Sequence, residues 1–325
     1  MRTKAKMRIG YVATMLATGL LVVGGATPAG ATFPGENGRI AFESAMVTKN
    51  NPEGDSEIFT MNPDGSGLRQ LTKNEDRDTS PVFSPDGGRI AFESSRDSAS
   101  LAHDIFVMRV DGSRQRNVTD SPDEFDGGAT WSPSGKKLAF HSRRDDNTDV
   151  FKMNADGSGQ RNLTAGSEYL EEYPAWSPAG GRIAFQSNRD AEGFGTDDIF
   201  VMNADGSGPK NLTETVEDID YAANWSPDGG RITFTIQDGD SGDNDVYTMK
   251  SDGTGQRNLT RNPGADDSLS VYSPDGKHVA FESDRDADAI FGSDIFTMKA
   301  DGSRQKNVTD RSGEFTSDPD WQRKR

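Results

Sequence analysis

The chain has 325 residues, of which 27% are charged and 32% hydrophobic, with a formal net charge of −17 and no cysteine. Few apolar residues combined with an excess of one charge are typical of disordered chains, because little apolar burial is available to offset the entropy of ordering. The acidic balance excludes non-specific binding to nucleic acid, and the lack of cysteine excludes disulfides and thiolate metal sites. The composition leaves a disordered acidic chain or a fold built mostly of turns and short strands.

The first 31 residues have the pattern of a secretory signal peptide. Four cations lie within residues 1–8, an apolar run covers 9–26, and Ala-Gly-Ala at 29–31 is a small-x-small cleavage motif. An uncleaved membrane anchor is the alternative, since the run approaches the length of a spanning helix. We expect cleavage, which removes four cations and no acid and changes the net charge from −17 to −21. The mature product is then expected outside the cytoplasm, secreted or periplasmic, without stable membrane insertion.

Short signatures recur along the rest of the chain in a fixed order: Trp-Ser-Pro-Asp-Gly, Arg-Ile-Ala-Phe, Asp-Ile-Phe-x-Met and Asp-Gly-Ser-Gly-x-Arg-Asn-Leu-Thr. The Asp-Gly pair begins at six positions that are 45–49 residues apart: Asp64, Asp111, Asp156, Asp205, Asp252 and Asp301. This is the period of four-stranded propeller blades. Apolar runs between Pro- and Gly-containing turns predict four strands per repeat, a to d, joined as a meander. The repeat therefore favours an all-β fold over disorder.

The first repeat lacks strand a, because the chain enters the pattern at strand b, over residues 38–44. Five further repeats follow, and the missing strand is found at the C-terminus, over 319–322. Gln322 follows Thr309 by 13 residues, the same interval that separates Thr119 from Ser132. We therefore predict a six-bladed β-propeller over residues 32–325, closed by the C-terminal strand. Such closure removes exposed sheet edges.

The segments 176–185 (Trp-Ser-Pro-Ala-Gly-Gly-Arg-Ile-Ala-Phe), 198–208 (Asp-Ile-Phe-Val-Met-Asn-Ala-Asp-Gly-Ser-Gly) and 224–229 (Asn-Trp-Ser-Pro-Asp-Gly) resemble the WD40-like (PD40) repeats of the TolB β-propeller family. The resemblance covers essentially all of 32–325. In complete TolB proteins it implies an α/β domain ahead of the propeller, for which residues 32–36 leave no room. We therefore expect a TolB-like propeller rather than a complete TolB protein.

Strand polarity places the a–b and c–d turns on one face, named face B, and the b–c loops and d–a connections on the opposite face, named face T. Face T carries the variable segments, where binding residues usually lie. At one position of the d–a connection five repeats carry an acid and the sixth carries Thr316; the acids are Asp78, Asp126, Glu171, Asp220 and Asp267. If strand a is innermost, this ring of acids borders the channel mouth and suits a cation or a basic peptide segment. The alternative is that each carboxylate caps local backbone amides.

Apolar residues immediately precede four of the ring positions: Phe125, Leu170, Ile219 and Phe315. They either form an apolar lip of the mouth or lie buried beneath the loops.

The b–c loops contain a second recurring pattern, an Arg-Asp pair: Arg96-Asp97, Arg144-Asp145, Arg189-Asp190 and Arg285-Asp286. An acid follows at the start of strand c: Asp104, Asp149, Asp198 and Asp294. Its recurrence predicts a structural role, in which the guanidinium bridges two carboxylates and braces the hairpin.

One b–c loop lacks the arginine and carries four aspartates instead: Asp238, Asp240, Asp243 and Asp245. They resemble a hard-cation loop, so Ca²⁺ is a possible ligand, although Met249 stands where an EF-hand requires glutamate. A solvated acidic loop is the alternative.

Other patterns carry no chemistry of their own. Asn-x-Thr recurs in strand d, so we interpret it as part of the repeat and not as a glycosylation signal: Asn117, Asn162, Asn211, Asn258 and Asn307. The histidines His103, His141 and His278 occupy different repeat positions and suggest no shared metal site or general base. No phosphate loop or nucleophile elbow is found.

We expect a monomeric, non-enzymatic propeller that binds a protein or peptide partner, basic in character and assisted by Ca²⁺, through face T. The alternative is a polysaccharide lyase- or hydrolase-like enzyme that uses carboxylates and a metal in the channel. A convergent set of histidines or arginines in the channel would distinguish the two.

Overall fold

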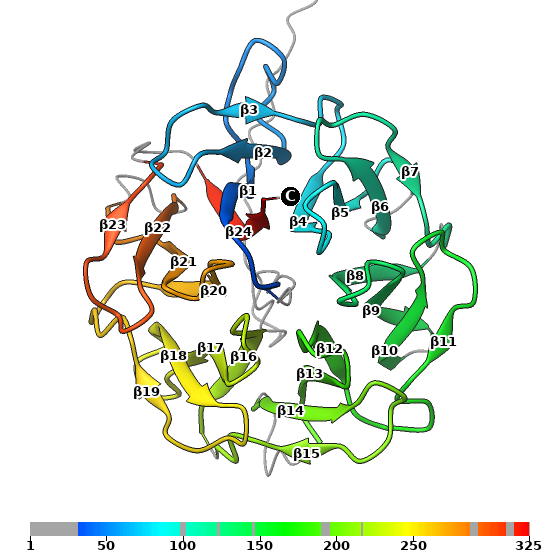
Figure 1. The fold of residues 1–325 in the computed structure, drawn as a ribbon, viewed down its shortest axis with the longest axis vertical. Helices are drawn as coiled ribbons and strands as arrows, with labels where there is room; N and C mark the ends of the chain where they lie inside the picture. The colour runs from blue at the N-terminus through cyan, green and yellow to red at the C-terminus, as the bar shows by residue number, and fades with distance from the viewer. Residues whose placement is uncertain are drawn as a thin grey trace, which may run out of the picture.

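The computed structural model describes residues 32–97, 102–121, 124–144, 147–189, 196–215, 217–286, 292–309 and 315–324. These residues form six antiparallel sheets of four strands, which are arranged as a ring around a common axis, that of the expected channel (Figure 1). The predicted six-bladed β-propeller is confirmed. The predicted signal peptide, 1–31, lies outside the described residues.

Each blade runs from an inner strand at the channel to a two-residue outer strand at the rim (Figure 1). Blade 1 consists of β24 (Thr316–Arg323), β1 (Asn37–Ser44), β2 (Glu57–Met61) and β3 (Arg69–Gln70). Blade 2 consists of β4 (Asp78–Phe83), β5 (Arg89–Ser94), β6 (Asp104–Arg109) and β7 (Arg116–Asn117). Blade 3 consists of β8 (Phe125–Trp131), β9 (Lys137–Arg144), β10 (Asn147–Asn154) and β11 (Arg161–Asn162).

The other three blades repeat this plan. Blade 4 consists of β12 (Glu171–Trp176), β13 (Arg182–Ser187), β14 (Asp198–Asn203) and β15 (Lys210–Asn211). Blade 5 consists of β16 (Ile219–Trp225), β17 (Arg231–Gln237), β18 (Asn244–Lys250) and β19 (Arg257–Asn258). Blade 6 consists of β20 (Asp267–Tyr272), β21 (His278–Ser283), β22 (Asp294–Lys299) and β23 (Lys306–Asn307).

The C-terminal strand β24 closes the ring by pairing with β1. Ile40 lies opposite Trp321, as Ile90 lies opposite Phe83 in blade 2. The predicted completion of the first blade is therefore confirmed with the register that the other blades use.

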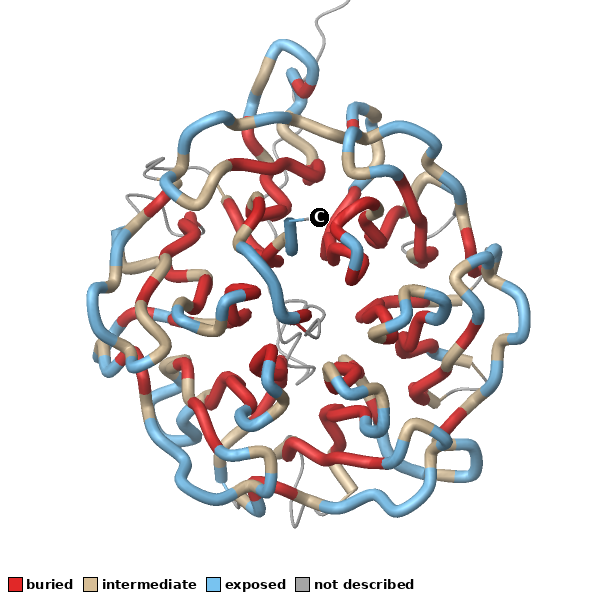
Figure 2. Tube along the Cα trace, in the orientation of Figure 1, coloured by how far each residue is buried: buried red, intermediate tan, exposed pale blue. Residues whose placement is uncertain are grey.

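Apolar side chains of neighbouring blades pack against one another, and Figure 2 shows that buried residues lie mainly on the strands inside the ring, with exposed residues at its rim. The phenylalanine of strand b is fully buried in every blade: Phe42, Phe92, Phe140, Phe185, Phe234 and Phe281. Because a blade is covered on both sides, strands b and c are continuously apolar instead of alternating. A few large apolar side chains per blade are enough to form the core, since each blade stacks on its neighbour and buries them.

Backbone hydrogen bonds place the loops on the two predicted faces. On face B, the c–d turn of a blade bonds its own a–b turn, as Val110 N does to Gly88 O at 3.1 Å. On face T, the entry to four of the inner strands bonds the end of the preceding blade's b–c loop, as Asp78 N does to Ser56 O at 2.8 Å. In the described part of the chain, no helix has the length and apolar character needed to cross a membrane.

Every inner strand contains a bulge, where its register with strand b shifts. The residue at the bulge has a positive φ in all six blades: Ser80, Gly128, Tyr173, Ala222, Leu269 and Asp318. The conformation costs a non-glycine residue about 1 kcal/mol, so something must stabilise it. In blades 2, 3, 4 and 6 its amide donates to a strand b side chain of the preceding blade. Ser80 N lies 3.1 Å from Glu43 Oε2 and Leu269 N lies 3.3 Å from Thr235 Oγ1.

The first glycine of each c–d turn is required by the packing of blades. Gly157 has a φ of +90°, and a Cβ there would lie 2.2 Å from Val118 O in blade 2. The carbonyl belongs to the backbone, so it yields only if the two blades separate. Gly166 has a similar φ of +86° but no atom within 4 Å of its Cβ position.

Replacing Gly157 by alanine is expected to lower the free energy of unfolding by about 3 kcal/mol, because backbone strain and the clash add. Gly166→Ala adds the strain alone and should cost about 1 kcal/mol. Urea unfolding followed by tryptophan fluorescence measures both values. Equal losses for the two variants would contradict the cross-blade contact.

Candidate functional site

The five acids of the predicted ring occupy equivalent places on the inner strands, at or next to the first residue of β4, β8, β12, β16 and β20. Thr316 takes the same place on β24. The structure therefore brings the predicted residues together around the face T mouth. All five acids are fully buried, however, so their carboxylates do not open freely to the channel.

Arginines of the b–c loops cover four of these acids. The guanidinium lies 2.6 Å from the carboxylate in Arg96–Asp78, 2.6 Å in Arg285–Asp267, 2.5 Å in Arg189–Glu171 and 3.4 Å in Arg144–Asp126. Each guanidinium also packs over the phenylalanine side chain of strand c. The predicted brace thus exists, but each arginine reaches one ring acid instead of bridging two carboxylates of its own loop.

The acid at the start of strand c has a different partner, the Asn-x-Thr of strand d. Asp104 accepts hydrogen bonds from the Asn117 side-chain amide at 2.8 Å and from the Thr119 hydroxyl at 2.8 Å. The same contacts recur at Asp149, Asp198, Asp245 and Asp294. The asparagine amide is engaged in each of these blades, which explains the recurrence of the motif.

Asp220 is the ring acid without an arginine. The arginine follows its acid by 18 residues in the four paired blades, and Asp238 stands at that place in blade 5. Burial raises the pKa of Asp220 to about 7. A hydroxyl, that of Thr215, lies 3.2 Å from its Oδ2, while Oδ1 has no hydrogen-bond partner.

A second set of polar side chains lies on strand b, next to the inner-strand bulges: Glu43, Glu93, His141, Gln186, Thr235 and Glu282. Burial raises the pKa of Glu43 and that of Glu282 to about 7. Burial and the nearby Glu43 also raise the pKa of Asp318 well above its usual range. This set was not predicted from the sequence. Its signal is a polar residue that directly follows the buried phenylalanine of each strand b.

Two histidines meet at this mouth although their repeat positions differ. The ring centroid of Phe125 lies 5.2 Å from that of His103 and 5.8 Å from that of His141. Burial lowers the pKa of His141 to about 4, and its Nδ1 accepts the amide of Tyr173 at 3.2 Å. His141 therefore acts as a neutral acceptor for a bulge amide, the role that Glu43 has in blade 1.

The apolar residues before the ring acids differ in exposure. Leu170 is 43% exposed and its neighbour Tyr169 is 46% exposed, whereas Phe125, Ile219 and Phe315 are partly buried. Both predicted alternatives therefore occur. An exposed apolar lip is confined to the segment before β12.

Three of the four aspartates of the loop over 238–245 accept hydrogen bonds from separate partners, and Asp240 is exposed. Asp238 accepts two amides of its own loop, Asp243 accepts the amide of Gly264 at 3.1 Å, and Asp245 accepts the Thr260 hydroxyl at 2.6 Å. Within the described ranges, no three carboxylate or imidazole groups are placed to hold a metal ion together. The side chains described here give the calcium hypothesis no ligand set.

A family model described as the TolB beta propeller domain (PD40) matches residues 22–192, more than half of the chain. The chain belongs to the TolB beta propeller domain family. Among curated relatives, a TolB homolog of Chlorobium luteolum is 29% identical over a segment that covers 33% of this chain and 33% of the relative. The matched segment thus spans about a third of that relative's length.

Solved structures of TolB proteins share the fold of this TolB-like propeller. TolB from Acinetobacter baumannii superposes with a TM-score of 0.72 and 20% identity, over 91% of this chain and 68% of that one. A putative TolB from Agrobacterium tumefaciens superposes with a TM-score of 0.64 and 19% identity, over 86% and 97% of the two chains. At these identities the likeness establishes the architecture and leaves ligands to be argued from the site.

Because Asp220 is buried without an arginine, the stability of the fold is predicted to depend on pH in an unusual way. With a pKa of about 7 in the folded state and 3.8 as the ordinary value, the folded carboxyl keeps a proton between about pH 4 and 7 that the unfolded one releases. Asp220 thus lowers stability as the pH rises through this range. Asp220→Asn is expected to raise the free energy of unfolding at pH 8 by up to about 4 kcal/mol, with little effect at pH 4.

Asp78→Asn is the matched variant, because it removes a ring acid that has an arginine. It leaves the guanidinium of Arg96 without its carboxylate and is expected to destabilise at pH 8 by about 1–3 kcal/mol. Thermal unfolding from pH 4 to pH 8 measures both variants. Destabilisation by both at pH 8 would contradict the distinction between paired and unpaired ring acids.

Proposed function

We propose that this TolB-like propeller is an exported, non-enzymatic binding module that holds a basic, partly apolar segment of a partner protein at its face T mouth. Export rests on the signal-peptide pattern of residues 1–31. Binding at face T rests on the exposed pair Tyr169 and Leu170 beside an inner strand.

The Tyr169–Leu170 pair is the observation that carries the proposal. Among the described residues, only these two and Val47 are large hydrophobic side chains with high exposure. Two adjacent exposed apolar side chains cost solvation free energy that a folded chain normally avoids, whereas binding sites use such pairs as anchors. They directly precede β12 and so lie where a segment entering the channel mouth would pass.

The acids around this pair favour a basic partner. Glu168 is exposed, and Glu172 and Asp197 are partly buried. Burial and the carboxylate of Asp197 raise the pKa of Glu172 to about 7. A lysine or arginine placed beside Glu172 would hold it ionised, so binding and deprotonation favour each other.

The side chains at the same channel mouth support the enzyme alternative less well than they support binding. His103, Glu93 and His141 do converge there, as a catalytic set would. However, His141 and Glu93 each accept a bulge amide of the next blade. These are structural contacts of the ring, and they engage His141 Nδ1 and Glu93 Oε1 in holding the next blade.

Fluorescence anisotropy with labelled basic, neutral and acidic peptides of equal length and hydrophobicity tests the proposal. The basic peptides are expected to bind, and Tyr169→Ala with Leu170→Ala should weaken binding tenfold or more, about 1.4 kcal/mol. Affinity should rise between pH 6 and pH 8, because Glu172 must lose its proton, and Glu172→Gln should flatten that rise.

Val47→Ala is the control, because it removes an exposed hydrophobic side chain far from β12 in the sequence. It is expected to leave peptide affinity unchanged. Equal binding of acidic and basic peptides, or full affinity in the double alanine variant, would overturn the proposed site.

A further inference from the structure

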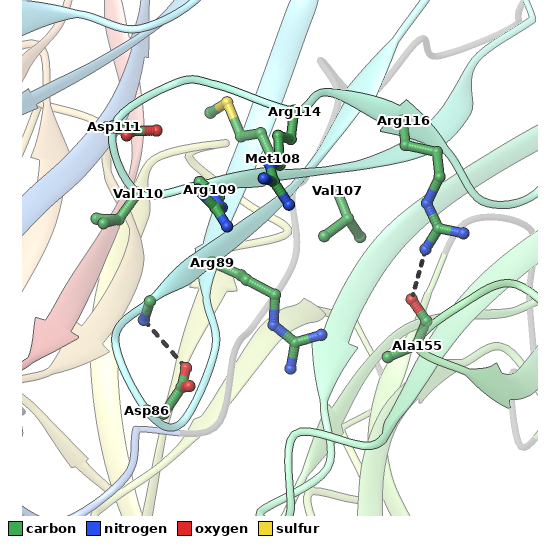
Figure 3. A pocket seen from close by; sticks show the side chains of 11 residues that line it. Asp86, Arg89, Val107, Met108, Arg109, Val110, Asp111, Arg114, Arg116 and Ala155 are labelled. Carbon is green, nitrogen blue, oxygen red and sulfur yellow. Dashed lines mark hydrogen bonds between the residues drawn. The ribbon is translucent and has the colours of Figure 1, made fainter.

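A pocket of about 660 Å³ lies on face B, between blade 2 and blade 3. Figure 3 shows its lining: four arginines from blade 2 surround it, with Val107, Val110 and Ala155 as apolar walls. The arginines are Arg89, Arg109, Arg114 and Arg116. Two carboxylates, Asp86 and Asp111, also line it, so the lining carries a net positive charge in a strongly acidic protein.

Two of the four arginines stand where blades 3 and 4 carry uncharged residues, whereas blade 6 carries Lys299 and Arg304 at the same two places. Blades 3 and 4 carry Asn154 and Asn203 at the place of Arg109, and each asparagine amide bonds the turn serine at 3.0 Å. Arg109 cannot make this hydrogen bond, and its side chain makes no other hydrogen bond with the described residues.

Arg114 stands where blades 3 and 4 carry Gly159 and Gly208. Its φ is +59°, the left-handed conformation in which glycine is favoured. An arginine here costs about 1 kcal/mol of strain relative to glycine. Its side chain is exposed and makes no hydrogen bond or ion pair with the described residues. No contact within the described chain therefore compensates the backbone strain.

The other two arginines are held in place by the next blade. Arg89 donates to Gly135 O at 2.7 Å and lies over the Trp131 ring, 4.4 Å from its centroid. Arg116 donates to Ala155 O at 3.3 Å (Figure 3). These contacts use only part of each guanidinium's five donors, so the remaining donors are pre-organised for an anion.

Face B is also the basic side of the molecule. Each outer strand begins beside this face with an exposed cation: Arg69, Arg116, Arg161, Lys210, Arg257 and Lys306. At physiological ionic strength charges are screened over about 8 Å. An anion near this pocket therefore experiences the local cations more than the distant acids of face T.

We propose that this arginine pocket of blade 2 binds the phosphate group of an anionic ligand, with Arg109 and Arg114 as the residues that recognise it. Two free guanidiniums match the two negative charges and the oxygen geometry of a phosphate monoester. The apolar walls leave room for a ring or short chain attached to the phosphate. The pocket is on the face opposite the peptide site, so the proposal stands apart from the proposed function.

The test uses the full mature chain with Arg109→Asn and Arg114→Gly, which restores the residues of blades 3 and 4. This variant is expected to fold and to be slightly more stable, because the strain at position 114 is removed. Titration calorimetry with inorganic phosphate and with glycerol 3-phosphate, at ionic strength matched with chloride, should show at least tenfold weaker binding than in the unchanged chain.

Arg304→Gly is the control, because Arg304 has a similar φ of +60° in the c–d turn of blade 6. It should raise stability in the same way and leave phosphate affinity unchanged. Flotation with phosphatidic acid vesicles separates a lipid source of the phosphate from a soluble one. Vesicle binding that the double variant abolishes supports a lipid headgroup, and binding of free phosphate alone supports a soluble ligand.

Two results would overturn the proposal. One is that neither phosphate nor vesicles bind to the unchanged chain. The other is that the Arg109→Asn, Arg114→Gly variant binds both with full affinity, which would place phosphate elsewhere on face B.

Discussion

The hydrogen bond from an inner-strand bulge amide to a strand b side chain of the preceding blade, made in four of the six blades, is the contact on which the ring depends. Six strands that converge on one channel must bend sharply, and the left-handed residue in each of them provides the bend. The bend turns an amide away from its own sheet, and a buried amide needs an acceptor. Glu43, Glu93, His141 and Thr235 supply that acceptor, so polar groups beside the channel are a consequence of closing the ring.

Convergence also explains how the ring acids are neutralised. Burial removes hydration from the carboxylates at this mouth, and burial with the nearby Asp198 and Asp218 raises the pKa of Asp220. In four blades an arginine of the neighbouring hairpin offsets part of this cost. In blade 1 both partners are absent, since Thr316 and Met46 take their places. The pairing is therefore a property of the repeat, and blade 5 alone keeps the acid without the arginine.

The sequence was sufficient to predict the blades, the closure by the C-terminal strand and the positions of the ring acids, because these follow from the period of local turn motifs. It did not reveal the partner of Arg96, because Asp78 lies 18 residues earlier on another strand and the two patterns recur independently. In blade 1 the ring acid and the arginine are lost together, at Thr316 and Met46, and this joint loss was the available indication that the two residues pair. Glu43 and Glu282 were missed because their partners belong to the next blade, and the polar residue after each strand b phenylalanine does not by itself indicate what it contacts.

The charge of the chain acts separately on its two faces. A six-residue strand spans about 20 Å, which exceeds the screening length of about 8 Å in physiological salt. The acids of the face T loops and the cations at the start of the outer strands are therefore electrostatically separate. A net charge of −17 describes neither face. The proposed basic peptide at the channel mouth and the proposed phosphate in the blade 2 pocket would therefore occupy separate faces and would not compete.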